Sequence, residues 1–356
     1  MRQAETHPSG GRLRQLDILR AVAVVGVIIQ HAPVRRSWLP GWTGVDLFFV
    51  LSGFLVSGVL FSEHKTHGSI RVGRFLIRRG FKIYPAFYCL IAARILISLT
   101  QGHHTAASHW LPEVLFFQNY LPGLWVHTWS LAVEEHFYLL LAIALVVMAK
   151  QRARDPFRAI PKLFGIVALI VLAARILTVV MLRPMPGRVL EPTHLRLDSL
   201  FCGVALSFVF HYRHTWIDRW AAPFRLRVGV LSAACLLPVL LTSITPLVLT
   251  IGLTSLYVGY AGVLLLALLG DMGPSWVPGS AWLSEGLAFV GRYSYSIYVW
   301  HIGVLDWVIV PLFRKSVRLW EVGFWPIGPL YLVASVVFGI AMAYLIETPA
   351  LRLRDR

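Results

Sequence analysis

Long apolar runs dominate this sequence and constrain its fold more than any other feature. About ten of them approach the roughly 20 residues that a helix needs to cross the hydrocarbon core of a bilayer. The runs show no alternation of polar and apolar residues, and open β-sheets do not occur in lipid because their backbone groups would be unpaired. The sequence therefore predicts an all-α, polytopic membrane helical bundle, with spans near residues 16–34, 45–62, 83–100, 129–149, 163–182, 198–212, 229–242, 246–269, 287–313 and 327–347.

The connections between the runs are only loop-sized, so residues 1–356 are expected to form a single transmembrane domain. The formal net charge is +16, but the basic residues are spread between the runs, which argues against nucleic acid as a partner. Lys and Arg are concentrated in alternate connections. By the positive-inside rule this pattern predicts that both termini are cytoplasmic, in a multi-pass protein of the cytoplasmic (inner) membrane.

The first run contains Arg20 and His31, although an ionisable side chain near the bilayer centre costs about 2.5 to 3.5 kcal/mol. Their separation amounts to about three helical turns, so both side chains point the same way, about 16 Å apart along the axis. In one interpretation Arg20 anchors an anion at the cytoplasmic side and His31 is a general base farther along. In the other, Arg20 reaches the interface and His31 ends a helix before Pro33.

A basic cluster lies at the start of the third span. Arginine forks bind phosphate oxygens in pairs and lysine adds a point charge, so the cluster could hold a phosphorylated ligand. The alternative is a juxtamembrane segment that sets topology and binds anionic lipids. The candidate residues are Arg74, Arg78, Arg79, Lys82 and Tyr84.

Further polar residues lie inside other runs. Ser52 offers a hydroxyl donor beside Gly53, which allows a close helix contact. Glu134 and Glu135 are adjacent, so they differ by about 100° around a helix and cannot share a face. One of them could orient His31 or bind a sugar hydroxyl; the alternative is an ion pair.

Arg196 and Asp198 are expected at the outer mouth of the bundle, where they could pair with each other or contact an acceptor; the ion pair of a glutamate could instead be with Arg175 or Arg196. His301 is a second candidate base in an aromatic-rich run, where a structural role is equally open. Neither the isolated cysteines nor the adjacent His103 and His104 have the spacing of a metal site, so no metal is predicted.

Several stretches together resemble the acyltransferase-3 family of integral membrane O-acyltransferases. They occur in order over nearly the whole chain: "LDILRAVAVVGVIIQH", "GVDLFFVLSGF", "RRGFKIYP", "TWSLAVEEHFY", "RLDSLFCGV", "YSYSIYVWH" and "IETPALRLR". The resemblance implies O-acetylation: transfer of an acyl group, usually acetyl from acetyl-CoA, to a hydroxyl of a cell-envelope carbohydrate such as a polysaccharide, lipopolysaccharide or other glycolipid. A secondary metabolite, such as a macrolide sugar, is the alternative acceptor.

Carried onto this chain, the family's spaced arginine and histidine are Arg20 and His31, and its basic pair before Tyr-Pro is Arg79 and Lys82. Lysine at the second position keeps the charge but loses the bidentate fork. Near the end, Glu347-Thr348-Pro349 lacks the arginine that the family commonly has between Glu and Pro. Some members carry a fused hydrolase-like domain, whereas we expect this chain to act as a stand-alone domain.

The resemblance and the residues together predict a mechanism. Acyl-CoA is a co-substrate rather than a resident cofactor, and its phosphates would lie near Arg20, Arg78, Arg79 and Lys82, with Tyr84 beside them. His31 would remove the acceptor's proton, Glu134 would assist it, and Ser52 would stabilise the oxyanion. The predicted acceptor contacts are Glu135, Arg196, Asp198 and His301. A transporter or flippase of a glycolipid or small anion is the main alternative, because such proteins also carry intramembrane Arg, Glu and His.

Overall fold

The computed structural model describes residues 14–33, 40–102, 106–151, 155–182, 186–270, 280–313 and 327–355, and every regular element in these ranges is helical. His103 and His104 lie outside the described residues. The principal helices are α1 (Arg14–His31), α2 (Gly44–His67), α3 (Val72–Thr100), α5 (Trp129–Ala149), α6 (Ile160–Leu182), α8 (Leu197–Tyr212), α10 (Arg225–Leu240), α11 (Leu253–Leu269), α12 (Ser280–Arg292), α13 (Ser294–Val304) and α16 (Ile327–Met342).

Shorter elements connect or extend these helices. The short α-helices are α4 (Ala107–Val114), α7 (Pro186–Leu190), α9 (His214–Trp216), α14 (Val310–Phe313) and α17 (Thr348–Arg354). Single turns of tighter or wider helix are η1 (Gly41–Thr43), η2 (Thr193–Leu195), η3 (Ile217–Ala221), η4 (Ala222–Phe224), η5 (Val248–Gly252), η6 (Leu305–Ile309) and η7 (Ala343–Glu347).

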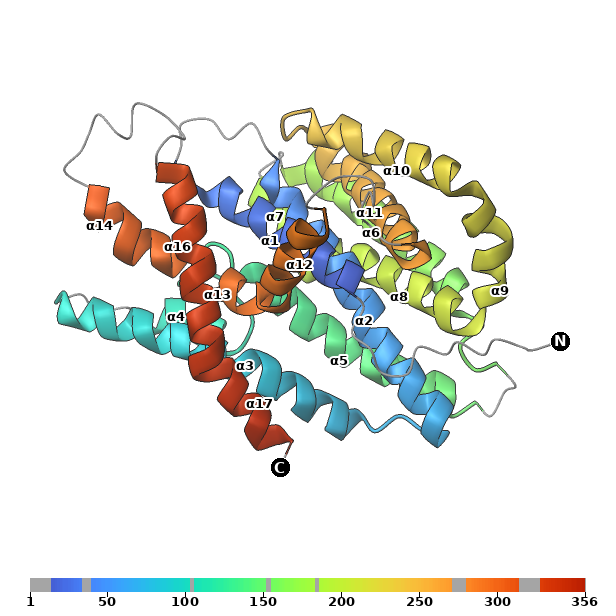
Figure 1. Ribbon diagram of the computed structural model, residues 1–356, viewed down its shortest axis with the longest axis horizontal. Helices are drawn as coiled ribbons and strands as arrows, with labels where there is room; N and C mark the ends of the chain where they lie inside the picture. The colour runs from blue at the N-terminus through green and yellow to red at the C-terminus, as the bar shows by residue number, and fades with distance from the viewer. Residues whose placement is uncertain are drawn as a thin grey trace.

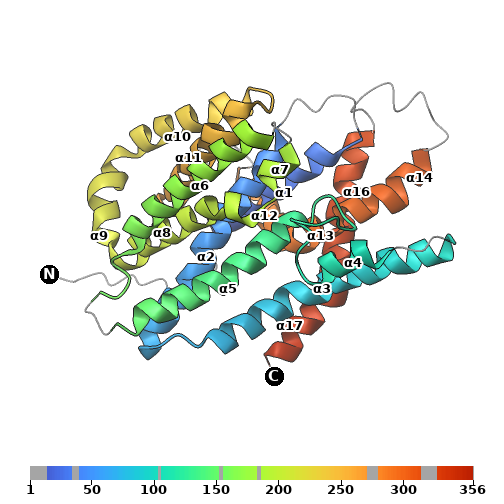
Figure 2. The same ribbon diagram turned by 180° about the vertical axis from the view of Figure 1, so that it is seen from behind.

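Within the described residues, 8 helices are long and apolar enough to cross a membrane once their continuing turns are included. This confirms the predicted polytopic helical bundle. Two further predicted spans are helical but fall outside that set: α8 has only 16 residues, and α1 contains the charged residues Arg14, Asp17 and Arg20. Figures 1 and 2 show α10 and α11 on one side of the bundle and α3, α14 and α16 on the other, with α1, α2 and α13 between them.

The most closely packed helix pair among the described residues is α2 and α8. Their backbones meet at Gly53 and Gly203, where a Cβ atom on Gly203 would lie 2.1 Å from the carbonyl oxygen of Val50. Only glycine permits this approach. Leu51 and Phe49 of α2 are buried beside this crossing, so α2 is fixed in the core, as is the Ser52 that it carries.

The span predicted near 287–313 is confirmed as Ser294–Phe313, which α13, η6 and α14 form, but it begins later than predicted because the helix is interrupted at Tyr293. The chain turns at Tyr293, between α12 and α13, and then continues through η6 into α14. The physical reason is the packing of α12 on α1: a Cβ atom on Gly291 would lie 1.8 Å from the carbonyl oxygen of Asp17. Because α12 crosses α1 so closely, α13 must start in a new direction. That turn places Ser294 beside α1 and sends Tyr298 and His301 into the core.

Candidate active site

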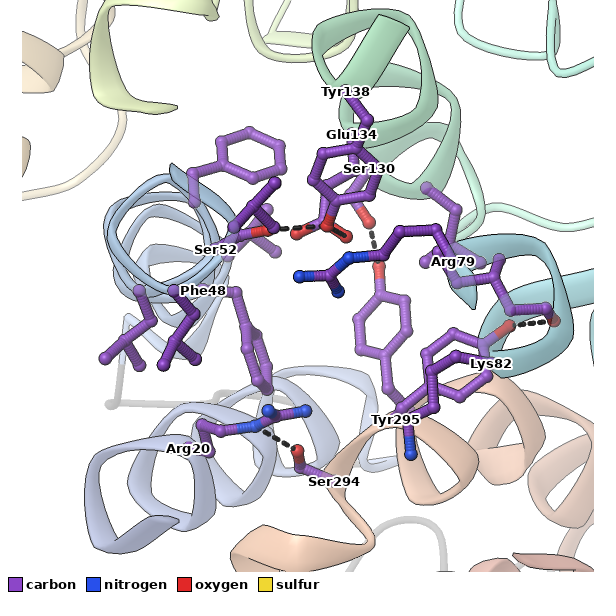
Figure 3. A pocket seen from close by; sticks show the side chains of 18 residues that line it. Arg20, Phe48, Ser52, Arg79, Lys82, Ser130, Glu134, Tyr138, Ser294 and Tyr295 are labelled. Carbon is purple, nitrogen blue, oxygen red and sulfur yellow. Dashed lines mark hydrogen bonds between the residues drawn. The ribbon is translucent and has the colours of Figure 1, made fainter. Parts of the chain in front are cut away.

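A cavity of about 150 Å³ opens between α1, α2, α3, α5 and α13 (Figure 3). We call it the Arg20 cavity. Apolar side chains such as Phe48 and Leu55 form much of its wall. The polar residues that line it are Arg20, Ser52, Arg79, Lys82, Ser130, Glu134, Tyr138, Ser294, Tyr295 and Tyr298. Five of them were predicted from the sequence: Arg20, Ser52, Arg79, Lys82 and Glu134. These five come from four different helices, α1, α2, α3 and α5.

Three cationic side chains reach this cavity. Arg20 donates from Nε to the hydroxyl of Ser294 at 3.0 Å. Figure 3 shows Arg79 extending from α3 toward the centre of the cavity, and its guanidinium lies 5.1 Å from the centroid of the Tyr138 ring. Lys82 forms an ion pair with Glu347. The wall is therefore suited to an anionic ligand, although the charge of Lys82 is already matched by a carboxylate.

Opposite the arginines, a chain of hydrogen bonds links α2 with α5. The Tyr138 hydroxyl donates to Oε2 of Glu134 at 2.9 Å and lies 2.6 Å from the hydroxyl of Ser52. Because the single Tyr138 proton is directed to the carboxylate, Ser52 donates to Tyr138. The Ser52 hydroxyl is thus hydrogen-bonded within the protein, and its oxyanion role stays a prediction.

The remaining residues of the predicted basic and acidic clusters point elsewhere. Glu135 accepts a hydrogen bond from the Tyr84 hydroxyl at 3.0 Å, so these two residues join α5 to α3. Arg78 is exposed on α3, one position before Arg79. Neither Arg78 nor the Tyr84–Glu135 pair lines the Arg20 cavity. As expected from their helical offset, Glu134 and Glu135 have different surroundings.

A second cavity, of about 250 Å³, lies next to the first. We call it the His31 cavity, and its polar and aromatic lining includes Gln30, His31, Trp42, His127, Trp129, Glu191 and Arg196. Val45 and Tyr298 line both cavities, so the two spaces adjoin at these side chains. Arg20 and His31, which the spacing placed on one side of α1, therefore open into neighbouring compartments.

His31 belongs to a cluster of three histidines from separate segments. Its Nδ1 lies 2.9 Å from the carbonyl oxygen of Val27 and 3.4 Å from Nε2 of His301 on α13. The rings of His127 and His301 meet edge to face, with their centroids 4.7 Å apart. His301 and His127 are buried. Tyr298 joins the cluster to the cavity wall, since its hydroxyl contacts Ser130 at 2.6 Å.

The segment before α5 holds His127 in place through Glu113. This buried carboxylate accepts hydrogen bonds from the backbone N–H of Leu124 at 3.1 Å and from the hydroxyl of Thr128. Burial raises the pKa of Glu113 to about 7, and burial lowers the pKa of His127 to about 3. His127 is therefore a neutral imidazole at physiological pH.

Arg196 and Asp198 do not pair with each other, which was one of the alternatives that the sequence left open. Arg196 donates to Asp46 of α2 at 2.7 Å, whereas Asp198 pairs with Arg175 of α6. The two residues are separated by two helical positions and so reach different neighbours. All four side chains are buried. Both arginines are thus engaged by aspartates and neither forms the alternative pair with Glu134 or Glu135, although Arg196 also lines the His31 cavity.

The sequence did not single out several residues of the two cavities: His127, Ser130, Tyr138 and Tyr295. The first three belong to the stretch 127–141 that had drawn attention through its glutamates. Helical spacing was the available signal for Ser130 and Tyr138, because residues 130, 134 and 138 recur every four positions and so share a face; it does not extend to His127, which precedes α5. Tyr295 had no such signal. It lies at the start of α13, whose first residue was not predicted.

Residues 13–345 match the family described as acyltransferase domain, the acyltransferase-3 family. The chain is 28% identical over 356 residues to the peptidoglycan O-acetyltransferase OatA of Listeria monocytogenes, which covers 94% of this chain and 55% of that protein.

Two other relatives give similar figures. A putative O-acetyltransferase of Staphylococcus aureus is 29% identical over 326 residues, with 82% of this chain and 50% of the relative covered. The putative peptidoglycan O-acetyltransferase YrhL of Bacillus subtilis is 28% identical over 366 residues, with coverages of 94% and 54%. The chain thus spans about half the length of the curated relatives it matches. No solved structure matches it.

Proposed function

The chain belongs to the acyltransferase-3 family of integral membrane O-acyltransferases, and from this premise we propose that it moves an acetyl group from acetyl-CoA to a hydroxyl of peptidoglycan or a related envelope carbohydrate. The observation that carries the proposal is the junction of two unlike cavities at Val45 and Tyr298. One cavity presents cations to an anionic donor, and the other presents an imidazole to an acceptor. The acceptor class is suggested by the names of two relatives.

The donor would occupy the Arg20 cavity. Arg20 and Arg79 are placed to bind the phosphates of CoA, because guanidinium groups form paired hydrogen bonds with phosphate oxygens. Exposed Arg78 would extend the same basic surface outward along α3. The concentration of Lys and Arg in alternate connections supports access from the cytoplasm. The thioester would then lie near Tyr298, at the junction with the His31 cavity.

The acceptor would occupy the His31 cavity. His31 takes the proton from the attacking hydroxyl as its oxygen bonds to the thioester carbonyl carbon. The carbon–sulfur bond then breaks, and the proton passes to the departing thiolate, so the products are an ester and free CoA. General-base catalysis of this kind contributes about 10² to 10⁴ in rate. Trp42 and Trp129 give the cavity apolar aromatic surface that suits the face of a sugar ring.

The test is CoA release by the purified protein in detergent or nanodiscs, supplied with acetyl-CoA and soluble peptidoglycan fragments, with mass analysis of the fragments. We expect an acetylated fragment with the wild type and loss of it in His31→Ala. His67→Ala is a matched control, because His67 also contacts the carbonyl four residues earlier but is exposed. Acetylation retained in His31→Ala would remove His31 as the base. If the wild type bound fragments and released no CoA, a transporter would become the better proposal.

A further inference from the structure

Backbone carbonyls fix the protons of all three clustered histidines. A carbonyl oxygen can only accept, so the ring nitrogen that contacts it must carry hydrogen. His31 donates from Nδ1 to Val27, and His301 donates from Nδ1 to Tyr298. His127 donates from Nε2 to Val299 at 3.1 Å. In the neutral state, Nε2 of His31, Nε2 of His301 and Nδ1 of His127 are therefore lone-pair nitrogens.

This assignment makes His31 the donor and His301 the acceptor in the contact between them. Nδ1–H of His31 faces a lone pair on Nε2 of His301 at 3.4 Å, while it also donates to Val27. Nε2 of His31 remains as the basic nitrogen. When it takes a proton, Nδ1–H becomes a charge-assisted donor, and such hydrogen bonds are about twice as strong as neutral ones. His301 is then the side chain placed to accept that donor.

We propose that His301 is a positioning residue that orients His31 and stabilises its protonated form during acyl transfer, an inference that rests on the proposed function. His301 does not line either cavity, and its side chain is fully buried. It therefore does not meet the substrates as a second base. Its own orientation is fixed on one side by the Tyr298 carbonyl and on the other by the edge of the His127 ring.

Few titratable groups surround this pair. His127 on the segment before α5 and Tyr298 on α13 face His301. Glu191 and Arg196 line the His31 cavity, where Arg196 is paired with Asp46. No carboxylate contacts either imidazole among the hydrogen bonds and ion pairs of the described residues. A histidine thus occupies the place that an aspartate takes in a Ser-His-Asp triad.

Two substitutions at His301 separate positioning from packing. His301→Phe keeps a planar ring but removes the acceptor. His301→Gln places an amide oxygen near the position of Nε2. We expect kcat in His301→Phe to fall about 10- to 100-fold, the loss typical when the partner that orients a functional imidazole in a metal site is removed. KM for both substrates should be unchanged, and His301→Gln should recover most of kcat.

The pH profile is the readout that a packing role would not move. Without an acceptor for Nδ1–H, protonation of His31 is less favourable, so the acid limb of kcat/KM in His301→Phe should move to lower pH. Wild-type kcat in His301→Phe would overturn the proposal. So would an equal loss in both variants with the acid limb in its original place.

A measurement without turnover separates this proposal from the proposed function. In ¹⁵N NMR spectra of histidine-labelled protein, His31 should carry its proton on Nδ1, and its Nδ1 signal should shift in His301→Phe but not in His67→Ala. An unchanged His31 signal in His301→Phe would refute the contact, whatever the activity. Failure of the wild type to release CoA would instead refute the proposed function while leaving the contact established.

Discussion

Lys82 on α3 and Glu347 in η7 form an ion pair, although they are separated by 265 positions in the chain. Ser296 of α13 donates to the second oxygen of the same carboxylate at 2.9 Å. Glu347 thus holds together the start of the C-terminal helix, α3 and α13 at the edge of the Arg20 cavity. The pair also compensates one of the three cations that face this cavity.

The first prediction is that Arg79 contributes more to acyl-CoA binding than Lys82 does. Arg79→Gln should raise KM for acetyl-CoA about 10- to 100-fold, since a hydrogen bond to a charged group is worth about 1.5 to 3 kcal/mol. The double variant Lys82→Met with Glu347→Gln removes both charges of a partly exposed pair, worth about 0 to 1 kcal/mol. Its KM should rise less than about fivefold. Equal increases in the two proteins would contradict this ranking.

The second prediction concerns the buried pair of Arg196 and Asp46. Asp46→Asn leaves a guanidinium buried without its counter-charge, which typically costs about 3 to 5 kcal/mol. The protein should therefore unfold at a markedly lower temperature in detergent. Asp155→Asn is the control, because its partner Arg213 is half exposed, and such pairs contribute about 0 to 1 kcal/mol. A similar midpoint in both variants would show that the buried pair is not a stabilising contact.

The fold could be predicted from the sequence because hydropathy and span length reflect a local property of each segment. Spacing also sufficed to put Arg20 and His31 on one side of a helix. Partners could not be predicted, because they are distant in the chain: His31 meets His301 at a separation of 270 positions. The break at Tyr293 was missed for a similar reason, since it depends on how closely α12 crosses α1 rather than on the residues around it.

The third prediction tests the crossing of α2 and α8. A Cβ atom on Gly203 would lie 2.7 Å from the backbone nitrogen of Phe54, so Gly203→Val must separate the helices. Overpacking of this kind costs about 1 to 3 kcal/mol, and it would also displace Ser52 from Tyr138. The measurements are the unfolding midpoint and CoA release, both of which should fall.

Gly165→Ala on α6 provides the control for the crossing. No atom lies within 4 Å of the position its Cβ would take, and alanine favours a helix over glycine by about 1 kcal/mol. Gly165→Ala should unfold at the same temperature as the wild type or slightly higher. If Gly203→Val behaved like Gly165→Ala, the close contact would carry no stability.

The last prediction is a pH dependence that comes from Glu113. Its pKa is about 7 in the folded protein, against 4.5 for an ordinary glutamate. Between these values the folded state holds a proton that the unfolded chain has released, so stability decreases as pH rises. The loss amounts to about 3 kcal/mol, at 1.36 kcal/mol per pKa unit, and it is complete just above pH 7.

Glu113→Gln does not titrate and should lack this component, although it also loses one accepted hydrogen bond. Unfolding midpoints measured from about pH 5 to 8 should therefore fall more steeply in the wild type and in the exposed control Glu285→Gln than in Glu113→Gln. Parallel curves for all three proteins would mean that Glu113 is not the group that couples folding to pH.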